Sequence, residues 1–397
     1  MSQRFQAIKE KESKLLCRSY NRYPLAIVKG KMSHLWDADG KEYVDLLAGI
    51  AVTALGHCND EIVQTLTEQA NKLWHVSNLF YQEEQLELAE ELLSTTHHTK
   101  VFFCNSGAEA NEAAIKLARR YMAKIKQREA YEIITLEGCF HGRTLGTLAA
   151  TGRASLSDGF TPLPAGFLQV PTNNIHALEK AINQKTCAVL LEVVQGEGGI
   201  IPLPQDYLKN VEKLCREKDI LFICDEVQAG FCRTGEFWAF QLHNLHPDIM
   251  STAKALANGL PMGAMLTTDD VARGFDLGSH ATTFGGGALA AKVAAKAIQI
   301  MKRDHLAKRA AELGQAFRER LNALDKKMPG KIKDIRQVGL MIGIELGDDC
   351  PRIWQELITK GFICSLSHNV TLRLLPALTI EENDLFRFVD TLEELLR

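Results

Sequence analysis

Long apolar runs are missing from this 397-residue sequence, and nowhere do about 18 apolar residues follow one another. A helix that crosses a membrane needs about 20 such residues, so the sequence predicts no membrane span. The N-terminal segment MSQRFQAIKEKESKLL is charged and amphipathic, and it lacks the apolar stretch of a secretory signal. We therefore expect a cytoplasmic protein.

A strong charge of either sign is also missing, because 46 Lys and Arg face 49 Asp and Glu and the formal net charge is −3. Proteins that bind nucleic acid attract its phosphates through a basic field, which this composition does not provide. Nucleic acid is therefore not an expected partner. Anionic substrates would need arginines placed near the site.

The ten cysteines form no C-x-x-C pair. Several lie inside apolar runs such as VFFC (101–104) and ILFIC (220–224), where a free thiol packs like a small core side chain. A disulfide scaffold or a metal site is the alternative. The placement favours free thiols in a reducing compartment.

The glycine pattern of nicotinamide-binding folds is absent as well. Such a fold needs G-x-G-x-x-G between a strand and a helix, whereas Gly285-Gly286-Gly287 precedes a long helical stretch without that spacing. A nicotinamide-dependent dehydrogenase is therefore a weak alternative.

What is present is a series of short apolar segments that alternate with helical patterns. This arrangement predicts a mainly parallel sheet covered by helices on both faces, in which some strands can run antiparallel. The expected strands are 101–104, 132–137, 187–194, 220–227, 248–252 and 263–268, and early helices are expected near 59–74 and 82–94.

Two further regions flank this sheet. Residues 24–56 form short strand patterns, with Asp39-Gly40 at a hairpin turn. A helical stretch over 286–325 leads to a strand-like segment at 335–346 and a final amphipathic helix near 381–396. We predict an α/β fold in which a small α+β domain combines both ends of the chain: an N-terminal segment (1–55), a large domain (56–290) and a C-terminal small domain (291–397).

Polar residues follow five of the expected strands, at the edge where open α/β sheets bind ligands. After the first strand, Ser106 can cap a helix, and Gly107 and Ala108 leave the first backbone N–H groups uncovered, as a phosphate site requires. The alternative is an ordinary helix start, with Glu109 completing a capping box.

The next two segments offer an aromatic ring and charged groups. In GCFHGR, Phe140 can stack on a flat ligand and Arg143 can bind a carboxylate, or Phe140 can simply pack in the core beneath a surface loop. In QGEGG, Glu197 is either exposed to the contents of the site or part of a solvated turn.

The last two segments carry the strongest chemistry. Asp225 and Glu226 end a buried strand, so they need a partner such as a protonated ring nitrogen or an arginine. Lys254 lies among small and apolar residues, where desolvation can make it a nucleophile, although this segment alone favours a helix-start lysine that reaches for solvent. All five segments together predict a pyridoxal-phosphate (PLP) site.

The sequence resembles the class III aminotransferases of PLP fold type I, and most closely the acetylornithine aminotransferases. The resemblance runs nearly end to end and is carried by YNRYPLAIVKGKMSHLWDADGKEYVDLLAGIAVTALGH (20–57), VSNLFYQEEQLELAEELL (76–93), FFCNSGAEANEAAIKLAR (102–119), FHGRTLGTLAATG (140–152), EVVQGEGG (192–199), ICDEVQAGFCRTG (223–235), STAKALANGLPMGAM (251–265) and TTFGG (282–286). The sequence departs from the family pattern in the loops at 255–263 and 287–288.

The resemblance implies a role for each residue that matches a family motif. Lys254 is expected to bind the cofactor covalently and Asp225 to face its ring nitrogen. The other cofactor contacts it implies are Phe140 and Val227 on the two ring faces, Gln228 near the ring hydroxyl, and Ser106, Gly107 and Ala108 around the phosphate. Thr283 is expected to reach the phosphate of a second subunit, which implies a homodimer. For the substrates, the resemblance assigns Arg143, Thr282, Arg373 and Glu197, the last as the acid that can pair with Arg373.

The activity implied by the resemblance is transfer of the terminal amino group of N2-acetyl-L-ornithine to 2-oxoglutarate, which gives N-acetyl-L-glutamate 5-semialdehyde and L-glutamate in arginine biosynthesis. The alternatives are the ornithine, succinylornithine, N-succinyl-diaminopimelate or 4-aminobutyrate aminotransferases, and a decarboxylase or aminomutase of the same fold. A non-catalytic small-molecule-binding protein is the alternative of another class.

Overall fold

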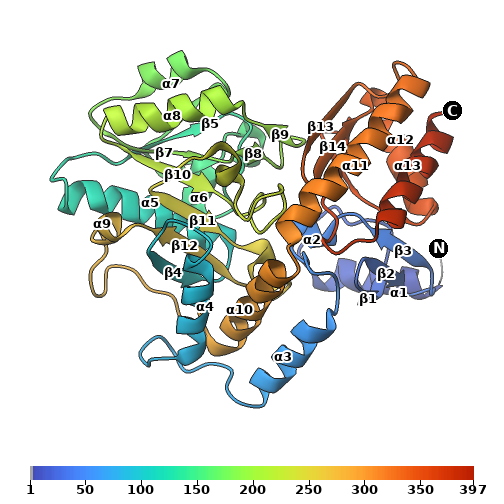
Figure 1. Cartoon of the computed structure of the whole chain (residues 1–397), viewed down its shortest axis with the longest axis horizontal. Helices are drawn as coiled ribbons and strands as arrows, with labels where there is room; N and C mark the ends of the chain where they lie inside the picture. The colour runs from blue at the N-terminus through green and yellow to red at the C-terminus, as the bar shows by residue number, and fades with distance from the viewer. Residues whose placement is uncertain (1–2) are drawn as a thin grey trace.

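A seven-stranded sheet forms the centre of the larger lobe in the computed structural model, which describes residues 3–397 (Figure 1). β12 runs antiparallel to both of its neighbours, and the other neighbouring pairs are parallel. The prediction of a mainly parallel sheet is thus confirmed. The strand order is β4 (Lys100–Cys104), β12 (Gly263–Thr267), β11 (Ile249–Thr252), β10 (Leu221–Asp225), β7 (Thr186–Leu191), β5 (Glu132–Leu136) and β6 (Phe167–Val170).

Helices cover both faces of this sheet, because alternate strand residues enter two different apolar clusters. Ile133, Leu190 and Ile223 pack with α5, whereas Val189 and Leu191 point to the opposite face and join a cluster that includes α8. The helices and short elements of this lobe are α5 (Gly107–Lys124), α6 (Leu145–Ala150), η1 (Ala154–Leu156), α7 (Ile175–Ala181), β8 (Val194–Gln195), β9 (Ile201–Pro202), α8 (Gln205–Glu217), η2 (Ala239–His243), η3 (Lys254–Ala257) and α9 (Asp269–Ala272).

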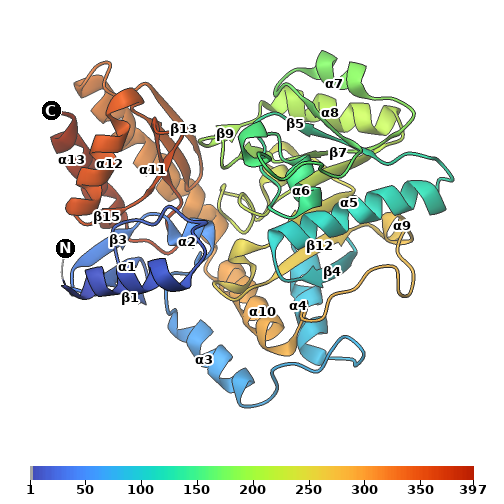
Figure 2. The ribbon, with the colours of Figure 1, turned by 180° about the vertical axis from the view of Figure 1, so that it is seen from behind.

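The smaller lobe combines the two ends of the chain, as Figure 2 shows from behind. β15 of the C-terminal region pairs in parallel with β3 of the N-terminal segment, so both ends contribute to one sheet. Gly40, at φ +84°, lies in the turn between β2 and β3, which confirms the predicted hairpin. The strand order of this sheet is β1 (Ile27–Lys31), β2 (His34–Asp37), β3 (Glu42–Asp45) and β15 (Phe362–Ile363). The second sheet of the smaller lobe has the strand order β13 (Asp334–Val338), β14 (Met341–Glu345), β17 (Thr371–Leu374) and β16 (Ser365–Ser367).

The remaining helices surround these sheets or connect the lobes. They are α1 (Gln3–Leu15), α2 (Ala48–Ala51), α3 (Asp60–Ala70), α4 (Glu83–Leu93), α10 (Ala288–Arg303), α11 (Leu306–Lys327), η4 (Gly347–Asp349), α12 (Cys350–Thr359) and α13 (Glu382–Leu396). Within residues 3–397, no helix has the length and apolar character needed to cross a membrane. The boundaries at 55/56 and 290/291 stay a prediction.

Two sequence-based expectations were wrong in detail. The helical stretch over 286–325 is two helices, α10 and α11, which are separated at His305, where the backbone takes φ +51°. The strand expected over 187–194 ends at Leu191, because Glu192 turns its side chain to backbone N–H groups of two loops. Edge strand β6 was not expected, since its four residues carry no continuous apolar run.

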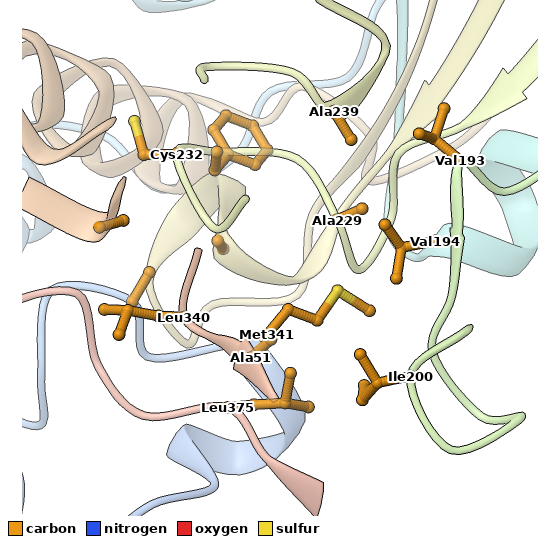
Figure 3. Close-up of a cluster of buried hydrophobic side chains, with 14 of the residues drawn as sticks. Ala51, Val193, Val194, Ile200, Ala229, Cys232, Ala239, Leu340, Met341 and Leu375 are labelled. Carbon is orange, nitrogen blue, oxygen red and sulfur yellow. The ribbon is translucent and has the colours of Figure 1, made fainter. Parts of the chain in front are cut away.

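An apolar cluster fills the junction between the lobes (Figure 3). Ala229 and Cys232, from the loop after β10, lie in it together with Leu340, Met341 and Leu375 of the C-terminal region. This packing brings the loops at the ends of the large sheet against the smaller lobe.

Candidate active site

A cavity of about 390 Å³ lies where β4, β5, β7, β10 and β11 end. Because the carboxyl ends of parallel strands meet at one edge, the five polar segments of the sequence come together here. Ten of the thirteen predicted site residues line the cavity: Ser106, Gly107, Ala108, Phe140, Arg143, Glu197, Asp225, Val227, Gln228 and Lys254.

Asp225, the last residue of β10, is buried and tightly oriented. Its Oδ2 accepts a hydrogen bond from Asn111 Nδ2 at 2.7 Å and lies 2.8 Å from His141 Nδ1, while Oδ1 accepts from the Val227 N–H at 3.0 Å. Burial lowers the pKa of His141, but Cys139 and Asp225 raise it well above its ordinary value. A proton on His141 therefore balances the negative charge that Asp225 presents to the cavity.

Lys254 enters the cavity from the chain that follows β11. Its backbone takes φ +44°, a left-handed conformation that is uncommon for a side chain of this size and often marks functional sites. Burial lowers the pKa of Lys254 to about 8. The negative charge of Glu197 raises this pKa, and the positive charge of nearby Arg373 lowers it further. Its amine consequently loses its proton far more readily than that of an exposed lysine.

The start of α5 forms another wall of the cavity. Ser106 is the N-cap, and its hydroxyl accepts from the Glu109 N–H at 3.2 Å, as predicted. The first N–H groups of a helix have no intrahelical acceptor, so those of Gly107 and Ala108 are available to an anion. A Cβ on Gly107 would lie 2.7 Å from Val227 Cγ1, so only glycine permits this close approach.

Phe140 and Arg143 lie on the loop after β5. The Phe140 N–H donates to Glu192 Oε1 at 2.9 Å, and the Gly196 N–H donates to Glu192 Oε2 at 3.1 Å. Burial and nearby Asp225 raise the pKa of Glu192 to about 7, although His141 opposes the shift.

The exposed Arg143 guanidinium lies 5.6 Å from the centroid of the Phe140 ring and forms no ion pair with any carboxylate in residues 3–397. It is therefore free to bind an incoming carboxylate.

Arg373 approaches the cavity from β17 of the smaller lobe. Its Nη1 donates to Glu197 Oε1 at 2.5 Å and to the Gly196 carbonyl at 3.3 Å, and its Nε donates to Ser365 Oγ at 3.0 Å. Burial raises the pKa of Glu197, but Arg373 and Lys254 lower it more strongly, so the net shift is downward. The buried arginine is thus paired with an ionised acid on the cavity wall.

The two predicted threonines lie outside this cavity. Thr282 Oγ1 accepts from Asn105 Nδ2 at 3.2 Å, whereas Thr283 is exposed and has no hydrogen-bond partner in the described chain. Both line a separate surface hollow of about 1010 Å³. Within one chain, Thr283 does not contribute to the cavity that contains Lys254.

Among the cavity residues that were not predicted, Asn111, His141 and Glu192 orient the predicted ones through hydrogen bonds. Asn111 is one helical turn after Gly107, and His141 is inside a motif already identified. Glu192 ends an apolar strand just as Asp225 does. Glu192 could therefore have been predicted from the sequence, because it is a charged residue at the end of an apolar strand.

The residues present fit PLP. Gln228 Oε1 is buried at the cavity and has no hydrogen-bond partner among residues 3–397, so a donor on a bound ring would satisfy it. Asp225 offers a carboxylate for a protonated ring nitrogen, Phe140 and Val227 offer apolar faces, and the start of α5 suits a phosphate. A half-buried lysine and a buried aspartate that line one cavity at this sheet edge, with these further contacts, are the arrangement expected of a pyridoxal-phosphate enzyme.

Comparison with known proteins identifies the family. Residues 16–396 match the family model for the class III aminotransferases. This chain belongs to that family and is a PLP-dependent aminotransferase, which acts on an amino donor and an oxo acid. The predictions of family, fold class, enzyme class and cofactor are confirmed at this level.

Several named relatives cover almost the whole chain. An acetylornithine aminotransferase of Methanocaldococcus jannaschii is 43% identical over 383 residues, which is 96% of each chain. Another, from Caldanaerobacter subterraneus, is 44% identical and covers 97% of this chain and 98% of the relative. An ornithine aminotransferase structure from Toxoplasma gondii superposes with a TM-score of 0.95 at 30% identity, covering 99% of this chain and 94% of the other.

Proposed function

We propose that this chain transfers the terminal amino group of N2-acetyl-L-ornithine to 2-oxoglutarate. The observation that carries the proposal is the pair of arginines at one cavity, because Arg143 has no acidic partner while Arg373 is paired with Glu197. Both proposed substrates carry carboxylates, which arginine binds in a bidentate manner. The names of the relatives at about 40% identity support the same donor.

In this proposal each cavity residue has one physical task. When bound, PLP supplies an aldehyde that takes up the amino group and a ring that stabilises the electrons released from the substrate carbon. Lys254 binds the cofactor and, once free, moves a proton as a neutral amine, for which its lowered pKa is suited. Asp225 keeps the ring nitrogen protonated, and its own orientation is fixed by Asn111 and His141.

The remaining cofactor contacts orient the ring and phosphate. With PLP bound, Phe140 and Val227 would enclose the two faces of its ring, and Gln228 would accept a hydrogen bond from its hydroxyl. Ser106, Gly107 and Ala108 would hold the phosphate at the start of α5.

The two arginines serve different carboxylates. Arg143 binds the carboxylate of acetylornithine, while Glu197 keeps Arg373 neutralised. When 2-oxoglutarate enters, its carboxylate displaces Glu197 and takes the guanidinium of Arg373. One cavity can thereby accept substrates that differ in charge and length.

We also infer a homodimer in which Thr283 of each subunit completes the phosphate site of its partner. Thr283 is exposed and unpartnered in the described chain, and the surface around it exposes several large apolar side chains: Leu79, Phe80, Tyr81, Leu277 and Phe284. Apolar patches of this kind mark protein interfaces.

We also infer a cytoplasmic location. All ten cysteines are free, including exposed Cys17 and Cys58, and free thiols are typical of a reducing compartment.

The test of the proposed function is a panel of amino donors offered to the PLP-loaded protein with 2-oxoglutarate. The panel contains acetylornithine, succinylornithine, ornithine and 4-aminobutyrate. We expect kcat/KM to be highest for acetylornithine. Ornithine aminotransferase is the second candidate, because the T. gondii enzyme superposes so closely. A preference for ornithine, or equal use of all donors, would refute the assignment.

A further inference from the structure

Arg233 is a buried arginine without an acidic partner. Only 2% of its surface is exposed, and its Nη1 donates to two backbone carbonyls, those of Leu340 at 3.1 Å and Pro376 at 2.5 Å. No carboxylate of residues 3–397 forms an ion pair with it. Burial lowers the pKa of Arg233 to about 9. An unpaired buried charge is costly for folding, so its presence calls for an explanation beyond stability.

The two ends of this contact belong to different lobes. Arg233 follows β10 in the same loop that presents Asp225, Val227 and Gln228 to the cavity. Leu340 is in the turn between β13 and β14, and Pro376 comes three residues after Arg373. The Arg233 side chain therefore connects the cofactor side of the cavity to the strand that carries the substrate arginine.

The backbone of Arg233 also contacts the turn between β13 and β14, but here Arg233 is the hydrogen-bond acceptor. The Leu340 N–H donates to the Arg233 carbonyl at 2.9 Å. Gly339 takes φ +55°, and a Cβ there would lie 2.6 Å from the same carbonyl oxygen. The two segments thus approach as closely as backbones can.

Around the Arg233 side chain the junction is otherwise apolar and less directional. Ala229, Cys232, Leu340, Met341 and Leu375 pack there as one cluster (Figure 3). Other polar contacts between the lobes come from the segment around Glu197, where Arg336 Nε donates to the Gly199 carbonyl at 3.0 Å and Arg373 pairs with Glu197. Apolar packing is proportional to buried area and tolerates small sliding movements, whereas hydrogen bonds weaken steeply when their angle changes. The Arg233 hydrogen bonds are therefore directional contacts that align the loop after β10 with the C-terminal region.

We propose that Arg233 is a positioning residue that sets the distance between Arg373 and the Lys254–Asp225 side of the cavity. It touches neither substrate nor cofactor in this account. The proposal rests on the proposed role of Arg373 as the anchor for the oxo acid. It adds that this anchor is placed from the large lobe, through the carbonyl of Pro376.

Two substitutions at Arg233 and one matched control test the proposal. Arg233→Met keeps much of the volume and removes every donor, and Arg233→Lys keeps a cation with a different donor geometry. The control is Arg309→Met. Arg309 also donates to carbonyls of the C-terminal segment, those of Leu378 at 3.1 Å and Ile380 at 2.7 Å, but it belongs to helix α11 and not to the loop after β10.

The first measurement separates the two halves of the reaction. For Arg233→Met we expect KM for 2-oxoglutarate to rise about tenfold or more, because misplacing a binding group by about 1 Å costs up to 10²-fold. The single-turnover rate with the amino donor, followed by cofactor absorbance, should stay within about threefold of the native rate, since that half does not use Arg373 as anchor. Arg309→Met should leave KM unchanged even if its melting temperature falls.

The second measurement does not depend on substrate. Hydrogen exchange at the Leu340 and Met341 amides should become faster in Arg233→Met and unchanged in Arg309→Met. If Arg233→Met does not fold, Arg233→Lys takes its place in the test. A KM for 2-oxoglutarate that is several-fold higher in Arg233→Lys than in the native enzyme would then support the proposal. An unchanged KM, or an equal rise with Arg309→Met, would overturn the proposal. A native enzyme that prefers another donor would instead refute the proposed function, and KM for its oxo acid would still test Arg233.

Discussion

At the scale of single residues, the cavity combines charged side chains that burial alone would not permit. Lys254 has a lowered pKa, Glu192 a raised one, and Glu197 a lowered one because Arg373 is paired with it. Perturbed pKa values of both signs within one cavity are typical of catalytic sites. Here they leave Lys254 with an amine that gives up its proton easily.

The lowered pKa of Lys254 predicts how the cofactor-free protein captures PLP as pH changes. Only the neutral amine attacks the aldehyde, and its fraction rises with pH until the pKa is passed. With a pKa of about 8, the capture rate should rise up to about pH 8 and then level off. An ordinary lysine has a pKa of about 10.4, so its rate would continue to rise far above that pH.

Stopped-flow absorbance of PLP mixed with the cofactor-free protein checks this prediction. Nα-acetyl-lysine under the same conditions serves as the reference for an unperturbed amine. A capture rate that climbs in parallel with this reference across the whole range would contradict the lowered pKa.

Residue-level prediction from the sequence worked where the signal was local. The segments around Gly107, Phe140 and Asp225 each follow a strand, so the common edge of the sheet brings them together. Glu192 was missed although, like Asp225, it comes at the end of an apolar strand. His141 was missed because its partner Asp225 lies 84 residues away in sequence, which no local pattern reveals. The pairing of Arg373 with Glu197 was suggested by the family resemblance and not by any local pattern.

At the scale of elements, the break between α10 and α11 was not predictable from the sequence. Neither glycine nor proline marks it, and the sequence MKRDHLAKR continues the helical pattern. The backbone nevertheless reverses at exposed His305, which takes φ +51°. Tertiary packing determines this break, since α10 lies against α3 and α4 while α11 packs on α13.

His305→Gly should therefore stabilise the protein. Glycine adopts positive φ without the steric conflict of a Cβ, so we expect the free energy of unfolding to rise by about 1 kcal/mol. Lys308→Gly, at an exposed position inside α11, should lower it by about 1 kcal/mol. Denaturant unfolding of both variants checks the pair, and a loss of stability with His305→Gly would show that its conformation is not strained.

At the scale of the whole molecule, one surface combines exposed apolar side chains with the two predicted threonines. The segments around Leu79 and Leu277 expose large apolar side chains beside the hollow lined by Thr282 and Thr283. Asn78 Nδ2 donates to the carbonyls of Thr282 at 3.2 Å and Gly285 at 3.0 Å, which connects the two segments. This surface is where we place the contact between two copies of the chain.

Leu277→Asp should dissociate the proposed dimer, because it places a charge in an apolar interface. PLP affinity should fall at the same time, since Thr283 would no longer reach the partner's phosphate site. The control is Leu242→Asp, at an exposed apolar residue of η2 outside this surface. Light scattering after gel filtration measures the mass. A monomeric native chain, or a variant that stays dimeric with full PLP affinity, would contradict the proposal.

The central claim is that Lys254 carries the cofactor, and peptide mapping after borohydride reduction of the PLP-loaded protein tests it most directly. Reduction makes the bond between cofactor and lysine permanent, so the labelled peptide identifies the residue. We predict that the label is on the peptide that contains Lys254. In Lys254→Ala we expect neither the label on this peptide nor turnover. A label on another lysine, or a Lys254→Ala variant that still transaminates at the native rate, would contradict this account.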